Sequence, residues 1–499
     1  MESIAEKYSA PQRQSKVAIG IILIKLVRQT IKAFWPILLS FFIGGKNGNS
    51  FVDYVGYIAL AFAALNVFGS ILTFFRFYFH IEDGAIVIDK GVLKRSKVNI
   101  PFERIQTINF QQNILHQMFG VVSLEIDTAG AGKAELTIDA LNKEEAEAIR
   151  QFILTERKAV ISEVDSSEES LEEEKGDTIL HLGISDLIKI GVSQNHLRSM
   201  GLLFAFVFST MNEITDDITG LVESQVDGYE SFLANNKWAV MALSILLVAF
   251  ISFVYSIISI TLSNYDLKLS LKKNGLKLVR GLLNRQEISV NKKKVQVVSW
   301  SDNPIRRLFN MYTLQIDQAS STDAAQLKSK IKVPGSYQHQ VDKVAKNVFP
   351  AEYYRPEKKN KVNKILLTRI NVLVGIIPAL IAQTLYFALG WYCLLFLLWI
   401  PLIGSIANMY YRKRSFELNK ELLKNSRGTF GNMYELLQLR KIQAIQIKQS
   451  WYQRRKKLAN VTLFTASGSI KIPFLDLNQA EDLEKYVLYK VESDKREWM

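Results

Sequence analysis

Apolar runs long enough to cross a membrane alternate along this chain with regions of two-residue periodicity. Residues 54–79, 238–262 and 391–411 each contain at least twenty mostly apolar positions. At 1.5 Å per residue, such a run spans a hydrocarbon core of about 30 Å. A shorter or more polar apolar run precedes each of them, at residues 33–44, 200–211 and 365–389. The pattern therefore predicts six transmembrane helices, arranged as three hairpins.

The run that opens each hairpin carries charge near its beginning. Lys25, Arg28 and Lys32 recur at spacings of three and four, which places them on one face of a helix. Such a face is typical of an interfacial helix that bends into the bilayer while its cations reach the lipid head groups. It is also compatible with an ordinary transmembrane helix that has a basic end, and the sequence leaves both alternatives open.

Charge also indicates how the hairpins are oriented. The connection at residues 212–236 contains six acidic residues and no Lys or Arg, whereas Lys and Arg cluster after each hairpin. The cytoplasmic flanks of membrane helices are enriched in Lys and Arg. We therefore predict a multi-pass protein of the cytoplasmic (inner) membrane, with both termini and every soluble region on the cytoplasmic side.

The region after the first hairpin, residues 80–157, alternates apolar and polar positions in short segments separated by turn signals such as Asp83-Gly84. It closes with a helical pattern that begins at Asn142, a residue suited to cap a helix, and continues with acidic residues at the positive end of the helix dipole. This pattern predicts an α+β module: an antiparallel β-barrel or sandwich followed by one C-terminal helix.

The module occurs three times in the chain. Residues 105–108 (IQTI) align without a gap with residues 295–298 (VQVV) and 442–445 (IQAI). Internal repetition decides the architecture before any other feature does. The predicted units are hairpins at 17–79, 179–262 and 351–411, modules at 80–157, 263–350 and 412–493, and an acidic linker at 158–178 that is disordered or a solvated helix.

Composition excludes several classes of function. The single cysteine, Cys393, lies in an apolar run, and the five histidines show no metal-ligand spacing. The chain has no G-x-S-x-G or H-E-x-x-H motif and no base-stacking aromatic pattern on an open sheet. We therefore predict no enzyme, no catalytic, cofactor-binding or metal-binding residues, and no nucleic-acid partner.

One part of the first module has a more specific form, made up of residues 91–93 (GVL), 100–106 (IPFERIQ), 113–115 (NIL) and 119–120 (FG). In these residues the chain resembles the bacterial family of membrane-flanked proteins with pleckstrin-homology (PH) like domains, of the YdbT type, in three copies. The resemblance implies PH-like modules, a cytoplasmic-membrane location, no catalytic residues and, for some members, resistance to antimicrobial peptides. In the second and third copies PFER becomes NKKK and QLRK.

Basic clusters are the candidates for a binding site. The net charge of +14 implies an anionic neighbour, and each Lys or Arg held beside anionic lipid gains about 1 kcal/mol. The alternative is a solvated surface that only sets the topology. The candidate contacts with anionic lipid are Lys25, Arg28, Lys32, Lys94, Arg95, Lys292, Lys293, Lys294, Arg306, Arg307, Arg454, Arg455, Lys456 and Lys457.

Together these features predict a non-enzymatic membrane protein that presents PH-like modules at the inner leaflet. It would serve as a scaffold or receptor for anionic lipid or for a partner membrane protein, such as a smaller protein of the same family, and contribute to envelope protection. The alternative is a transporter or exporter subunit in which six helices form a bundle around a path. Pro36, Gly375 and Pro378 would supply breaks in such helices. A membrane hydrolase is a third alternative.

Overall fold

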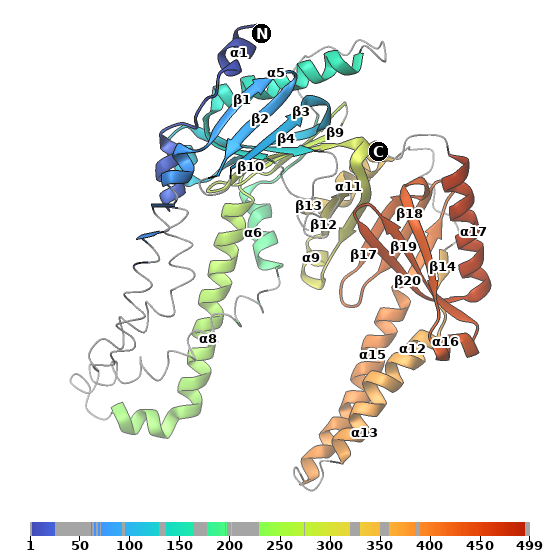
Figure 1. Ribbon diagram of the computed structural model, residues 1–499. Helices are drawn as coiled ribbons and strands as arrows, with labels where there is room; N and C mark the ends of the chain where they lie inside the picture. Colours follow the sequence, from blue (N-terminus) through green and yellow to red (C-terminus); the bar gives the residue numbers. More distant parts are fainter. Residues whose placement is uncertain are drawn as a thin grey trace.

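The structure is a computed structural model of the 499-residue chain. It describes residues 2–24, 71–91, 95–128, 136–162, 177–194, 229–273, 275–319, 330–349, 359–384 and 390–494, with single positions between 61 and 69 and at 196 and 201. Three β-rich modules stand in a row, and the described membrane helices project from one side of that row (Figure 1).

Module 1 contains two three-stranded antiparallel layers and a long helix. The first layer is β1 (Tyr78–Glu82), β2 (Ala85–Lys90) and β3 (Ser96–Pro101), and η1 (Phe102–Arg104) leads out of it. The second layer is β4 (Ile105–Gln112), β5 (Val121–Thr128) and β6 (Leu136–Asn142), with α4 (Ile114–Met118) between β4 and β5 and α5 (Lys143–Ser162) after β6. Buried Ile149 and Ile153 of α5 lie one turn apart on one face and close the core over Ile88 and Leu124.

The other two modules repeat this order of elements. Module 2 consists of β8 (Lys268–Lys272), β9 (Gly275–Arg280), β10 (Arg285–Asn291), η2 (Lys292–Lys294), β11 (Val295–Ser301), α9 (Pro304–Leu308), β12 (Met311–Gln318), β13 (Lys330–Tyr337) and α11 (Gln338–Val348). Module 3 consists of β15 (Ser415–Leu418), β16 (Leu422–Arg427), β17 (Met433–Gln438), η6 (Leu439–Lys441), β18 (Ile442–Lys448), α16 (Trp451–Arg455), β19 (Leu458–Thr465), β20 (Gly468–Asp476) and α17 (Leu477–Ser493). The threefold repeat is therefore a structural repeat.

The glutamine of the repeated I/V-Q motif has a structural explanation. In each module the register between the first and second strands of the second layer shifts at this residue, which is Gln106, Gln296 or Gln443. A β-bulge adds one unpaired residue, bends its strand and increases the local twist. The motif that revealed the repeat thus marks the point where the second layer bends.

Each module also uses a segment that precedes its hairpin. Strand β7 (Asp177–His181) pairs with β8, and β14 (Lys359–Lys361) pairs with β15. In module 1 the equivalent contact is the isolated bridge between Gln12 and Phe79. Strand β7 straddles the boundary that the sequence pattern placed between the acidic linker and the second hairpin. Residues 163–176 of that linker lie outside the described residues.

The sheets run across the module boundaries, which the sequence pattern did not predict. Strand β4 of module 1 pairs with β10 of module 2, and we call this contact the first junction. Strand β11 of module 2 pairs with β17 of module 3, and this contact is the second junction. Two seven-stranded sheets result, with the orders β6-β5-β4-β10-β9-β8-β7 and β13-β12-β11-β17-β16-β15-β14. A three-stranded sheet remains at each end of the row, β1-β2-β3 and β18-β19-β20.

The second junction is buried on both faces. Val298 and Leu436 contact the core of module 2, whereas Val297 and Leu437, on the opposite face of the same two strands, contact the core of module 3. Consecutive apolar residues are typical of strands covered on both sides. One sheet therefore joins two hydrophobic cores.

Three described helices are long and apolar enough to cross a membrane: Ile245–Ser263 within α8 (Tyr229–Ser263), Ile365–Gln383, and Leu394–Arg412. The last of these combines part of η5 (Gly390–Leu398) with α15 (Trp399–Arg412). The predicted spans at 33–44 and 200–211, apart from residue 201, lie outside the described residues, as do twelve of the 26 residues of the span at 54–79. The count of six therefore stays a prediction, while the three described spans agree with a membrane protein.

The span at Ile365–Gln383 widens in the middle. It consists of α12 (Ile365–Ile370), the π-helical segment Asn371–Ile376 and α13 (Ile377–Gln383), in which Pro378 occupies the first turn. A π-helical turn releases carbonyls from the regular helix ladder, and Trp399 of α15 donates its indole N–H to the carbonyl of Val374 at 2.8 Å. The two helices of the third hairpin are thus tied together at this point.

Candidate membrane-facing site

A short helix connects the first two strands of the second layer in every module. Each helix is capped by a side-chain oxygen that accepts the N–H three residues further on, and the capping residues are Asn113 in α4, Asn303 in α9 and Ser450 in α16. Each also exposes a large apolar side chain, because Met118, Leu308 and Trp451 are 74%, 80% and 71% exposed. Met118 and Leu308 end their helices, whereas Trp451 begins α16. An exposed apolar residue on the same short helix of all three modules indicates a shared interaction surface.

Two hairpin loops lie where membrane helices enter the modules. In the β9–β10 loop, the N–H of Leu282 donates to the carbonyl of Leu262, in the last turn of the α8 span, at 2.9 Å. In the β16–β17 loop, the carbonyl of Thr429 accepts from Nζ of Lys413, the residue after α15, at 2.6 Å. Both loops expose apolar side chains, Leu282 and Phe430. The loops therefore lie at the ends of two of the described spans.

The short helices stand beside these loops. Gln117 of α4 donates to the carbonyl of Leu282 at 2.8 Å, and Asp302, just before α9, accepts the N–H of Asn432 at 2.7 Å. At each junction the helix of one module thus meets the loop of the next. The short helices α9 and α16 lie on the side of their modules from which the spans project (Figure 1).

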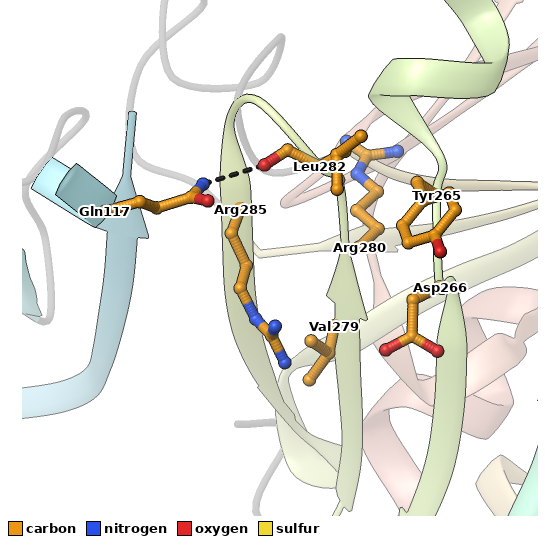
Figure 2. Close-up of a pocket in the computed structure, with 8 residues that line it drawn as sticks. Gln117, Tyr265, Asp266, Val279, Arg280, Leu282 and Arg285 are labelled. Atoms are coloured by element: carbon orange, nitrogen blue, oxygen red, sulfur yellow. Dashed lines mark hydrogen bonds between the residues drawn. The ribbon is translucent and has the colours of Figure 1, made fainter. Parts of the chain in front are cut away.

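A hollow of about 90 Å³ opens at the first junction, beside the end of α8 (Figure 2). Its wall combines Gln117 of α4, Tyr265 and Asp266 of the turn after α8, and Arg280 and Arg285 of the β9–β10 hairpin. Liquid water occupies about 30 Å³ per molecule, so the hollow holds about three waters. A group of phosphate size fits this space, whereas a whole lipid does not.

The charged side chains around the hollow differ in whether they have partners within the protein. Asp266 contacts Lys268 at 2.8 Å and His181 at 3.0 Å, and the hydrogen bond from Lys268 is the main cause that lowers the pKa of Asp266. Arg280 donates to a backbone carbonyl of β13 at 3.0 Å, and burial lowers its pKa. Arg285 is exposed and has no carboxylate partner among the described residues. It is the cation of this hollow that remains open to an anion.

Several of the basic residues singled out in the sequence cannot be placed. Lys25, Arg28, Lys32 and Lys94 lie outside the described residues. Arg95 is exposed and occupies, one repeat earlier, the position of Arg285. The interfacial and transmembrane alternatives for the first hairpin therefore remain untested.

The Arg306-Arg307 pair is engaged within the protein. Arg306 is buried, and its guanidinium donates to Ser193 Oγ at 3.2 Å and also to Thr313 Oγ. Arg307 is exposed but contacts Asp302 at 2.9 Å. Because α9 begins at a capped turn, it directs Arg306 back toward the end of α6 (Ile184–Val192). Arg306 is therefore not available to a lipid head group in this conformation.

The remaining clusters lie at opposite ends of their modules. Residues 454–457 are exposed at α16, where the guanidinium of Arg455 stacks 3.8 Å from the ring of Trp451. Residues 292–294 form η2, which follows β10, whereas the β9–β10 loop that contains Leu282 (the Leu282 loop) precedes β10. Seven strand residues span about 23 Å. The three lysines of η2 are thus well removed from the Leu282 loop.

Sequence reasoning missed Arg285 and Gln117. It grouped cations by adjacency in the chain, and Arg285 has no basic neighbour. The signal that could have identified it was the repeat itself, because Arg95 and Arg285 hold one position of the G-x-L hairpin. The part played by Gln117 depends on a contact between two modules, which no pattern within one repeat reveals.

The described residues hold no group of three or more His, Cys, Asp or Glu side chains that could bind a metal ion. His181 and Asp266 do meet, but a lysine supplies the third member of that cluster. The side chains around the hollow can form hydrogen bonds and ion pairs.

Comparison with known proteins agrees with this architecture. A model of the bacterial PH domain matches the chain three times, at residues 22–157, 217–351 and 372–491, which is more than half of its length. The chain is also 26% identical to the UPF0699 transmembrane protein YdbT of Bacillus subtilis (strain 168), over 475 residues that cover 92% of this chain and 94% of that protein. The resemblance seen in the sequence is confirmed. The chain belongs to the bacterial PH-domain family, as a membrane protein with three copies of the domain.

Proposed function

We propose that the protein is a non-enzymatic scaffold of the cytoplasmic membrane whose PH-like modules bind anionic lipid head groups at the inner leaflet. One observation carries this proposal: the hollow that contains Arg285 opens beside the Leu282 loop, which is hydrogen-bonded to the end of the α8 span. The side chain of Arg285 extends from this end of the hairpin toward Val279 (Figure 2), and on this proposal it binds a phosphate that enters the hollow. The orientation toward the cytoplasm follows from the distribution of Lys and Arg along the chain.

The chemistry of the site fits a phosphate. A guanidinium presents paired N–H donors that match two phosphate oxygens, and the hollow has room for one such group. Leu282 lines it and Met118 is next to Gln117 in α4, and both offer exposed apolar side chains that can enter the head-group region. Charge and apolar insertion together give stable membrane association, whereas either alone is weak.

A transport path has less support. Within the part of the chain that the structure describes, the α8 span and the third hairpin stand apart and do not form one bundle (Figure 1). The widened turn at Asn371–Ile376 is tied to Trp399 within its own hairpin. The irregular turn in that helix thus holds the two helices of the hairpin together, so it is explained without a transport path.

Lipid retention by the full chain tests the proposal. Because strands cross the module boundaries, the whole protein is required. It is purified in detergent and titrated with phosphatidylglycerol or phosphatidylcholine, and retained lipid is counted by native mass spectrometry. Arg285→Ala should lower retention of phosphatidylglycerol about fivefold, which corresponds to about 1 kcal/mol for one charge. Retention should also fall as salt rises.

Lys293→Ala is the matched control, because it removes an exposed cation at the far end of β10 and should leave lipid retention unchanged. Equal retention of the two lipids, or equal losses in the two variants, would contradict the lipid site. We also propose a contribution to envelope protection. Cells that carry Arg285→Ala should then be more susceptible to cationic membrane-active peptides than cells that carry Lys293→Ala.

A further inference from the structure

The two junctions inside the chain follow one rule. In the first, Phe110 is opposite Glu287 and Gln111 is opposite Gln286. In the second, Trp300 is opposite Tyr434 and Ser301 is opposite Met433. Trp300 holds the repeat position of Phe110, and Tyr434 holds that of Glu287. The same two strands of the repeat therefore pair in the same register each time.

This rule leaves one unused edge of each kind. Strand β18 is the module 3 counterpart of β4 and β11, and among the described residues its one partner is β19. Strand β3 is the module 1 counterpart of β10 and β17, and its one partner in the described part of the chain is β2. Both strands are described along their full length, from Ser96 to Pro101 and from Ile442 to Lys448. An open edge presents unpaired backbone groups that invite another strand.

Side chains that are buried at an internal junction are exposed at the equivalent positions of the two end modules. Gln296 is fully buried at the second junction, whereas Gln443, at the same position of β18, is exposed. Lys441 is 4% exposed because it reaches into module 2 and donates to the carbonyl of Lys293 at 2.8 Å. Arg104, its counterpart before β4, is exposed. The positions that a neighbouring module covers inside the chain are thus bare at the two ends.

We propose that β18 of one copy of the protein pairs with β3 of a second copy, in the antiparallel register of the internal junctions. That register places Lys448 opposite Ser96, Ile447 opposite Lys97, and Ile445 opposite Asn99. The proposal goes beyond lipid binding and is independent of it. It identifies the partner as a second copy because this chain supplies both of the edges that the rule requires. Strand addition of this kind is a common mode of protein recognition.

The side chains of β18 fit the pairing. Where the core of the next module would cover it, β18 carries Ala444 and Gln446, both exposed. The second junction has Val297 and Ser299 at these positions, next to the core of module 3. Both side chains are uncharged, as at the second junction, so the pairing would bury no charge at these positions.

Charge supports the same pairing. At the first junction Arg150 of α5 contacts Glu287 of β10 at 2.9 Å. The buried residues of α5 and α17 have the same spacing, with Ile149 of α5 corresponding to Leu483 of α17. The residue after each of them is Arg150 and Glu484, so Glu484 is the counterpart of Arg150. The counterpart of Glu287 on β3 is Lys97. The ion pair would form again with its signs exchanged, between Glu484 of one copy and Lys97 of the next.

The assembly is compatible with one membrane. The internal junctions leave the described spans of modules 2 and 3 on the same side of the row (Figure 1). A third junction that repeats the same strand pairing would place the spans of the second copy on that side as well. A head-to-tail contact of this type continues into a ring or an open row of chains.

Cysteine crosslinking of the full chain in membranes tests the register. Two differently tagged chains are coexpressed in a Cys393→Ser background, one with Ser96→Cys and the other with Lys448→Cys. Directly opposed strand residues have Cβ atoms about 4.5–5.5 Å apart, within reach of a disulfide with a small adjustment. A mixed dimer should form under mild oxidation. Lys97→Cys paired with Lys448→Cys is the matched control and should crosslink at least fivefold less, because a shift of one residue turns the side chain to the other face.

Charge exchange tests the contact without cysteines. Lys97→Glu and Glu484→Lys should each weaken association of the full chain two- to fivefold, as for a partly exposed ion pair, and the double variant should restore it. Ala444→Arg should abolish dimers, whereas Ser469→Arg, exposed on the other edge strand β20, should not. A chain that stays monomeric in membranes, or equal crosslinking in both registers, would overturn the proposal. So would occupation of β18 by a shorter PH-like protein in place of a second copy.

Discussion

The two junctions share one geometry but differ in chemistry. The first joins three residue pairs and depends on polar groups: Glu287 bridges Arg150 and Lys277, and Asn109 accepts the N–H of Ser289. The second joins five pairs and stacks Trp300 on Tyr434, with ring centroids 5.4 Å apart. Backbone pairing sets the register in both cases, so the side chains at the contact were free to diverge.

The difference predicts unequal strength. Burial of apolar side chains on both faces stabilises the second junction by several kcal/mol, whereas partly exposed ion pairs contribute about 1 kcal/mol or less. Under stress the first junction should therefore open before the second. Hydrogen exchange of the full chain measures this directly, because it reports the opening of each strand separately.

The largest effect is expected from Trp300→Ala. Trp300 is 3% exposed and lies in the core of module 2, and removing a buried aromatic side chain costs about 3–5 kcal/mol. The amides of β11 and β17 should exchange far faster than in the parent protein. Trp451→Ala is the control, because Trp451 is 71% exposed and its removal should leave exchange in β17 unchanged. Equal effects of the two variants would contradict the importance of the stack.

The second prediction concerns Lys441, a buried lysine at the second junction. Burial lowers the pKa of Lys441 to about 8, from an ordinary value of 10.5. An unfolded chain therefore binds more protons than the folded one between these values, and stability rises as the pH rises from about 8 to about 10.5. The gain is at most about 3 kcal/mol. The neutral amine keeps two N–H donors for the carbonyls of Lys293 and Val295.

Exchange of the β17 amides, corrected for the intrinsic rate at each pH, measures this gain. The corrected exchange rate of the β17 amides should be lower at pH 10 than at pH 8. Lys441→Met should remove this difference in rate, while Lys471→Met, at an exposed position of the same module, should preserve it. A parent protein whose second junction is insensitive to this change of pH would refute the role assigned to Lys441.

Much of this organisation can be read from the sequence, and the exceptions have physical causes. The repeat and the β-rich modules that each end in a helix follow from periodicity and spacing, and the PH-like family follows from the resemblance in the first module. Pairing between modules does not, because a period of two identifies a strand but not its neighbour. One signal was available: β11 reads VQVVSWS, with apolar residues on both faces, whereas β18 reads IQAIQIK and alternates strictly after its bulge. Consecutive apolar residues indicate a strand that is covered on both faces. Alternation does not mark an unpaired edge, because β4 reads IQTINFQQ, alternates after its bulge and still pairs with β10.

The candidate site was harder to predict for a related reason. Adjacent cations such as Arg306 and Arg307 drew attention, yet α9 turns Arg306 inward to Ser193. Arg285 gains its importance from the helix end and the short helix beside it. These neighbours are far apart in the chain, so only the folded structure brings them together.

The smallest of these effects is expected at the first junction, from Glu287→Gln. Burial raises the pKa of Glu287, but the hydrogen bonds from Lys277 and Arg150 outweigh it and hold the pKa below its ordinary value. A carboxylate with a lowered folded-state pKa stabilises the protein above its ordinary pKa of about 4.5, and this contribution is lost as the pH falls through the lowered value. The variant should lose about 1 kcal/mol at pH 7, with faster exchange in β10 and no change in β17. Added salt should produce the same change in the parent protein and little in the variant, because salt screens an ion pair but not a glutamine. If instead β17 responded to salt as strongly as β10, the division into a polar and an apolar junction would fail.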